Sequence, residues 1–226
     1  MPVYNAPLTT LDKNETRRYA GLKGKTEFSD KLLEEACTQA LILANPKGVW
    51  NNYPYNAATN NVLSQPLYQP LSADLSEHLQ NAVEVAILGV TIGEAVEKKV
   101  SDLFSSGDYT LALLLDAAAT AAVESIADSI NSLINTQAAK RGFKTTLRFS
   151  PGYGDWNITD QPTVLELAEA SKAGIAVTSS CMLIPRKSVT AVIGLVPQES
   201  SITRSLCGKP SCKACSQHHC LARKEF

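Results

Sequence analysis

An unbroken helical pattern from residue 109 to residue 137 constrains the fold of this chain more than any other feature. Apolar side chains recur there at spacings of three and four residues, which places them along one face of a helix. These side chains are Leu111, Leu115, Ala118, Ala122, Ile126, Ile130 and Leu133. The alanines at 117–119, 121 and 122 favour helix formation and let neighbouring elements approach closely. We therefore expect one long helix whose striped face is buried.

Shorter helices are predicted from start and stop signals. They cover residues 31–45, 72–79, 91–104 and 163–172. The first begins at Ser29 and Asp30 and is ended by Pro46. Thr91, with Glu94 three residues later, has the pattern of a capping box, so we expect a helix to begin there.

The strands predict the fold class. Strands are expected over residues 83–90, 144–149, 175–183 and 188–196. Only Pro185, Arg186 and Lys187 join the last two, and a parallel crossover needs a longer connection. Residues 47–71 are interpreted as loops and short strands because prolines and asparagines interrupt them. The prediction is an α+β fold with a mainly antiparallel central sheet flanked by long helices.

Composition excludes two classes of partner. The 226-residue chain is 44% hydrophobic and 19% charged, with a formal net charge of −1, so it offers no basic excess for nucleic acid or an anionic membrane. Its first ten residues lack the basic and apolar regions of a signal peptide. Glu84, Asp116 and Glu124 interrupt the most apolar segments, so no membrane span is expected. We expect a cytoplasmic protein.

The segment with the clearest chemical content is Arg-Phe-Ser-Pro-Gly-Tyr-Gly-Asp-Trp, which begins at Arg148. Pro151 and Gly152 occupy the two central positions of a type II turn. Such a turn can offer backbone groups to a ligand, Arg148 can hold a carboxylate, and Asp155 can accept from an ammonium or a ribose hydroxyl. The residues alone leave open that this is an ordinary surface turn.

This segment and Ser-Ser-Cys-Met-Leu-Ile-Pro-Arg-Lys-Ser-Val-Thr-Ala-Val downstream of it resemble the S-adenosylmethionine-binding activation domain of cobalamin-dependent methionine synthase. The family turn has Arg-x-x-x-Gly-Tyr, matched here by Arg148, Ser150, Pro151, Gly152 and Tyr153. Its later pattern is matched by Thr178, Met182, Pro185, Ser188 and Val189. The sequence departs from the family after Tyr153, where Gly154, Asp155 and Trp156 replace Pro-Ala-Cys-Pro, and at Val192 and Ile193, where the family has an aromatic residue.

The resemblance implies a function in which no side chain acts as an acid, base or nucleophile. Arg148 would hold the methionine carboxylate of S-adenosylmethionine, Glu124 its ammonium group, and the backbone of residues 151–154 its remaining polar edges. The activity implied is reductive methylation of cob(II)alamin to methylcobalamin. The chain lacks the Asp-x-His-x-x-Gly loop of corrinoid domains, so cobalamin would come from a partner, methionine synthase or another corrinoid protein. An electron donor such as flavodoxin or ferredoxin is also implied.

The last 20 residues contain four cysteines, at positions Cys207, Cys212, Cys215 and Cys220. Thiolates at this density suit zinc or an iron–sulfur cluster, although a flexible thiol-rich tail fits the spacing equally well. We therefore divide the chain into an activation-domain-like domain, residues 1–196, and a cysteine-rich tail, residues 197–226. Two alternatives to the activation function stay open. One is an electron-transfer or docking module that acts through the tail, and the other is a ligand-binding protein without methyl transfer.

Overall fold

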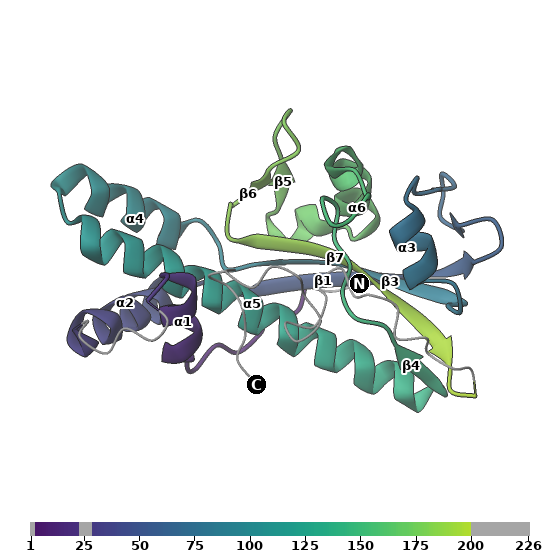
Figure 1. The fold of residues 1–226 in the computed structure, drawn as a ribbon, viewed down its shortest axis with the longest axis horizontal. Coiled ribbons are helices and arrows are strands. Elements are labelled where there is room, and N and C mark those ends of the chain that lie inside the picture. The colour runs from purple at the N-terminus through teal and green to yellow at the C-terminus, as the bar shows by residue number, and fades with distance from the viewer. Residues whose placement is uncertain (1–2, 23–28, 200–226) are drawn as a thin grey trace.

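The computed structural model describes residues 3–22 and 29–199. A five-stranded antiparallel sheet lies between two layers of helices, which confirms the predicted α+β class (Figure 1). The strand order is β2-β1-β3-β7-β4. The strands are β1 (Lys47–Asn56), β2 (Asn61–Val62), β3 (Glu84–Thr91), β4 (Phe143–Thr145) and β7 (Ser188–Pro197).

The longest helix, α5 (Tyr109–Lys140), crosses one face of the sheet and confirms the predicted helix. The same layer holds α1 (Lys13–Tyr19), α2 (Asp30–Leu43) and α4 (Ala95–Ser106). Gly48 of β1 lets α5 come close, because a Cβ atom at that position would overlap the side chain of Ile130. The alanine-rich surface of α5 therefore packs directly on the sheet.

The opposite face of the sheet is covered by smaller elements. These are α3 (Ala73–His78), α6 (Gln161–Leu167), the 3₁₀ turns η1 (Ile158–Asp160) and η2 (Ala170–Ala173), and a hairpin of β5 (Ala176–Val177) and β6 (Leu183–Ile184).

Two hydrophobic cores follow from this arrangement. Ala86 and Leu88 of β3 face the α5 layer, whereas Val85 and Ile87 face the α3 and α6 layer. Successive strand residues point to opposite faces, so a strand buried on both sides is apolar throughout. This explains the continuous apolar run that predicted β3.

By length and composition, α5 could also cross a membrane, since its mean hydropathy reaches 1.5 over one 18-residue window. In the structure, 67% of that window is buried. Burial of this kind is typical of the core helix of a globular domain.

Several details of the sequence interpretation were wrong. The helix expected over residues 163–172 ends at Leu167, and the strand expected over residues 144–149 ends at Thr145. The strand expected over residues 175–183 forms the separate β5–β6 hairpin, and its place in the sheet is taken by β1, which lies in the segment interpreted as loops and short strands. The capping box at Thr91 does not form, because Thr91 ends β3 and its hydroxyl accepts from the Gly93 amide. Helix α4 begins at Ala95 instead.

Candidate functional site

Arg148 lies just after β4, on a segment that runs beside β7. The carbonyl of Leu147 accepts a hydrogen bond from His78 Nε2 at 2.8 Å, and Phe149 pairs with Val192 in an isolated β-bridge. Burial lowers the pKa of His78 and so favours the neutral ring, in which Nε2–H can donate to this carbonyl. The backbone on both sides of Arg148 is thus fixed.

The guanidinium of Arg148 contacts two carboxylates of α5. Its Nη2 atom lies 3.2 Å from Glu124 Oε2 and 2.8 Å from Asp128 Oδ1. The Arg148 and Glu124 side chains are 20% and 27% exposed, whereas Asp128 is 70% exposed. Arg148 Nη1 is buried and has no hydrogen-bond partner among the described residues. Since both carboxylates accept from the same nitrogen, Nη2, neither forms the bidentate pair in which a guanidinium donates from two nitrogens to one carboxylate.

A second cation contacts the same surface of α5. Lys187 Nζ lies 2.9 Å from Asp116 Oδ1 and 2.9 Å from the Thr120 hydroxyl. Asp116, Thr120, Glu124 and Asp128 recur every four residues and so form one row along the helix. This row, with Arg148 and Lys187, is called the α5 charged row below.

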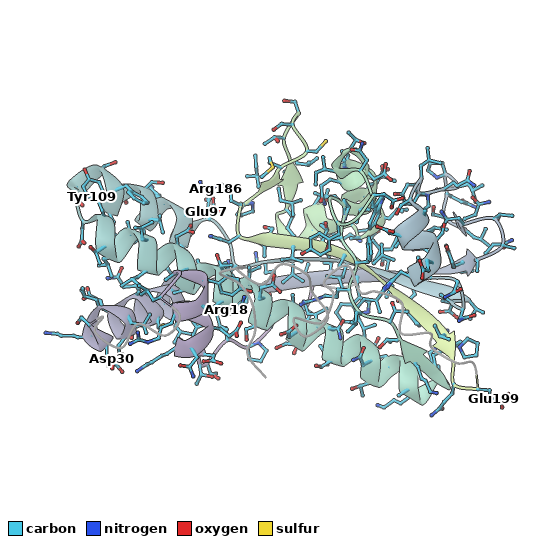
Figure 2. The ribbon with its side chains drawn as sticks, in the orientation of Figure 1. Arg18, Asp30, Glu97, Tyr109, Arg186 and Glu199 are labelled. Carbon is cyan, nitrogen blue, oxygen red and sulfur yellow. The ribbon has the colours of Figure 1, made fainter. Side chains whose placement is uncertain are left out.

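The loop that carries Lys187 is held by α4. Glu97 Oε1 accepts from the Lys187 amide at 2.8 Å, and Glu97 Oε2 lies 3.5 Å from Arg186 Nε. Figure 2 shows Glu97 and Arg186 side by side where α4 meets the start of β7. The Lys187 end of the row is therefore fixed by contacts from two helices.

The predicted type II turn is present at residues 150–153. Gly152 has φ +89°, and the Tyr153 amide donates to the Ser150 carbonyl at 3.1 Å. Pro151 is buried, whereas Gly152 and Gly154 are exposed. The turn therefore presents backbone at the surface at Gly152, four residues after Arg148.

Asp155 caps a helix. Its carboxylate accepts from the Ser72 hydroxyl and from the amides of Ala73 and Asp74 at the start of α3. The Ser72 hydroxyl, followed by the Ala73 amide, lowers the pKa of the Asp155 carboxyl. These partners give Asp155 a structural role, and its ligand-binding role stays a prediction.

The structure thus brings together Arg148 and Glu124, two of the predicted ligand-binding residues, and their ligand-binding roles stay predictions. Residues 151–154 follow Arg148 closely in the chain, yet the contacts of Gly154 and Asp155 are with α3. Asp128 was missed by the sequence analysis. Its position one helical turn after Glu124 is the signal that could have found it.

The four predicted metal ligands, Cys207, Cys212, Cys215 and Cys220, lie outside the described residues. Within the described ranges, no group of three or more His, Cys, Asp or Glu side chains is arranged to hold a metal ion. Cys37 is buried and Cys181 is partly exposed, and both are free thiols.

Comparisons with known proteins support the fold. No protein-family model matches the sequence, and a search of curated proteins finds no match. Among solved structures, the chain is similar to a crystal structure of the MetH reactivation domain bound to AdoHcy, with a TM-score of 0.63 and 16% sequence identity. The similarity covers 89% of this chain and 80% of that one. The chain therefore has a reactivation-domain-like fold, and bound AdoHcy is a property of that domain.

Proposed function

We propose that this chain binds S-adenosylmethionine and supports reductive methylation of cob(II)alamin to methylcobalamin on a partner corrinoid methyltransferase, methionine synthase in particular. The observation that carries the proposal is the contact of Arg148 with Glu124 and Asp128 in a chain with this fold. A guanidinium and carboxylates held side by side are the groups that recognise an amino acid, which presents a carboxylate and an ammonium on one carbon.

The charges of this cluster fit S-adenosylmethionine. One guanidinium and two carboxylates leave a net charge of −1 on Arg148, Glu124 and Asp128. S-adenosylmethionine carries a sulfonium, an ammonium and a carboxylate, and so has a net charge of +1. AdoHcy lacks the sulfonium charge and is neutral overall. Because Asp128 is 70% exposed, water screens most of its attraction for the sulfonium, so this charge match is a minor part of the proposed recognition.

The buried Arg148 Nη1 also fits an incoming carboxylate. A buried donor without a partner costs about 1–3 kcal/mol, so a ligand oxygen that reaches it recovers this free energy. In the proposed complex, Arg148 binds the ligand carboxylate and Glu124 binds the ligand ammonium. The exposed backbone at Gly152 and Gly154 contacts the remaining polar groups of the ligand.

When bound, S-adenosylmethionine supplies an electrophilic methyl group. The chain's own residues only fix its position and limit the access of water, so their contribution is proximity and orientation. Cobalamin is supplied by the partner, and an electron donor such as flavodoxin or ferredoxin supplies the electron. The proposed setting is the cytoplasm.

The experiment is a methylation assay with the full chain and a cobalamin-dependent methionine synthase that lacks its own activation domain. Cob(II)alamin, S-adenosylmethionine and a flavodoxin reducing system are supplied, and methylcobalamin is followed by its absorbance. The expected result is methylcobalamin formation that requires the chain and is lost in Arg148→Ala. Arg141→Ala is the matched control, because Arg141 pairs with Glu84 at the far end of α5. A rate that is the same without the chain would refute the proposal.

A further inference from the structure

The two carboxylates that contact Arg148 differ in their surroundings. Glu124 is 27% exposed, whereas Asp128 is 70% exposed and yet lies nearer to the guanidinium. An exposed ion pair contributes little to stability, because water screens it. The Asp128 contact is therefore the easier of the two to break.

The nitrogen that both carboxylates contact is also one that a ligand carboxylate needs. A bidentate carboxylate spans two guanidinium nitrogens, and here Nη1 has no partner among the described residues while Nη2 is occupied twice. A ligand carboxylate that bridges Nη1 and Nη2 must compete with the carboxylates already on Nη2. The weaker contact, with Asp128, is the one that yields.

We infer that Asp128 is a displaceable internal anion, which occupies Arg148 in the ligand-free chain and must leave before a ligand carboxylate binds. This inference rests on the proposed function and adds a residue that sets ligand affinity. Glu124 and Asp128 thus have opposite effects. Glu124 stays and binds the ligand ammonium, whereas Asp128 competes with the ligand carboxylate.

The inference also restricts the class of ligand that responds to Asp128. Only molecules with a carboxylate compete with Asp128 for Arg148. S-adenosylmethionine and AdoHcy have one, whereas 5′-methylthioadenosine contains the same nucleoside without the amino acid. Its binding should therefore be indifferent to Asp128.

The test is calorimetric titration of these three molecules into the wild-type chain, Asp128→Asn and Glu124→Gln. We expect Asp128→Asn to bind S-adenosylmethionine and AdoHcy about two- to fivefold more tightly than the wild type does, a gain of the size expected from the loss of an exposed ion pair. Its affinity for 5′-methylthioadenosine should be unchanged. Glu124→Gln should bind the first two more weakly. Asp102→Asn is the control for net charge, because Asp102 is an exposed carboxylate on α4. Asp128→Ala, which favours helix, repeats the test with a different side chain.

The outcomes separate the inference from the proposed function. If the wild type binds S-adenosylmethionine but Asp128→Asn and Asp128→Ala bind it equally or more weakly, the inference is wrong and the proposed function stands. An equal gain in affinity in Asp102→Asn would show that the effect arises from net charge alone, and this result would also overturn the inference. If neither the wild type nor either Asp128 variant binds S-adenosylmethionine, both the inference and the proposed function fail.

Discussion

Asp74 and Asp155 each bind the backbone of the other. The Asp155 carboxylate accepts from the Asp74 amide at 3.2 Å, and the Asp74 carboxylate accepts from the Asp155 amide at 3.1 Å. This reciprocal pair joins the start of α3 to the turn that follows Arg148. The position of the turn therefore depends on α3, which is 70 residues and more away in the sequence.

The Asp155 side of this pair makes stability depend on pH. Hydrogen bonds from Ser72 and Ala73 lower the pKa of the Asp155 carboxyl in the folded state, so its ionised form stabilises the fold. This contribution is complete above the unfolded pKa, near 3.8, and is lost as pH falls through the lower folded value. Asp155→Asn should thus lower the melting temperature at pH 7 by a few degrees, and the deficit should shrink below about pH 4. Melting curves from pH 7 to pH 3 measure this, and a deficit that is constant over that range would contradict it.

The glycines of the turn should differ in their tolerance of alanine. Both have positive φ, +89° at Gly152 and +53° at Gly154, which costs about 1 kcal/mol for a residue with a side chain. A Cβ atom at Gly154 would also overlap the Asp74 carboxylate, whereas at Gly152 it would only touch Ile158 at 3.4 Å. Gly154→Ala should therefore lower the free energy of unfolding by more than Gly152→Ala. Urea denaturation of the two variants measures the difference, and equal losses would show that the Asp74 contact is not limiting.

A shared carboxylate holds the other end of the turn. Asp160 Oδ2 accepts from the Tyr68 hydroxyl and from Trp156 Nε1, each at 2.8 Å, and Trp156 is 1% exposed. Asp160→Ala leaves the buried indole donor unpaired and should cost about 1–3 kcal/mol, whereas Tyr68→Phe removes one donor and should cost about 1 kcal/mol. Chemical denaturation followed by tryptophan fluorescence compares the two. A larger loss for Tyr68→Phe would contradict this ranking.

The long helix and the apolar strand were predictable because each is specified by its local pattern. The stripe of α5 predicts its length, and six of the seven stripe residues are buried, with Leu133 partly buried. The run from Val85 to Val90 is apolar because both faces of β3 are covered. In both elements, the apolar positions in the sequence are the positions that the fold buries.

The strand β1 could not be recognised in the same way. Its residues include Asn51, Asn52 and Pro54, which are unfavourable in strands. A strand that pairs along most of its length on one side tolerates proline, and β1 pairs with β3 over residues 47–54 but with β2 only at residues 55–56. This pairing is a tertiary feature with no local signal.

The reverse error occurred at residues 175–183. Their β-branched residues predicted a strand, but Cys181 has φ +62°, and the Met182 amide donates to the Thr178 hydroxyl. These features close a tight loop between β5 and β6. A positive φ at a cysteine is set by its surroundings and is not visible in the sequence.

The candidate site was predictable in part. The family resemblance supplied Arg148 and Glu124, and the structure places them 3.2 Å apart. It did not supply Asp128, nor the use of Asp155 as a cap for α3. Both depend on how α3 and α5 lie against the segment after β4, and that packing is decided by contacts distant in sequence.

The most direct test of the central claim is calorimetric titration of S-adenosylmethionine into the purified chain, beside Arg148→Ala and the Arg141→Ala control. The account expects the wild type and Arg141→Ala to bind with similar affinity, and Arg148→Ala to lose binding at least tenfold, since charged hydrogen bonds contribute about 1.5–3 kcal/mol. Binding that is unchanged in Arg148→Ala, or absent from the wild type, would contradict the assignment of this site to S-adenosylmethionine.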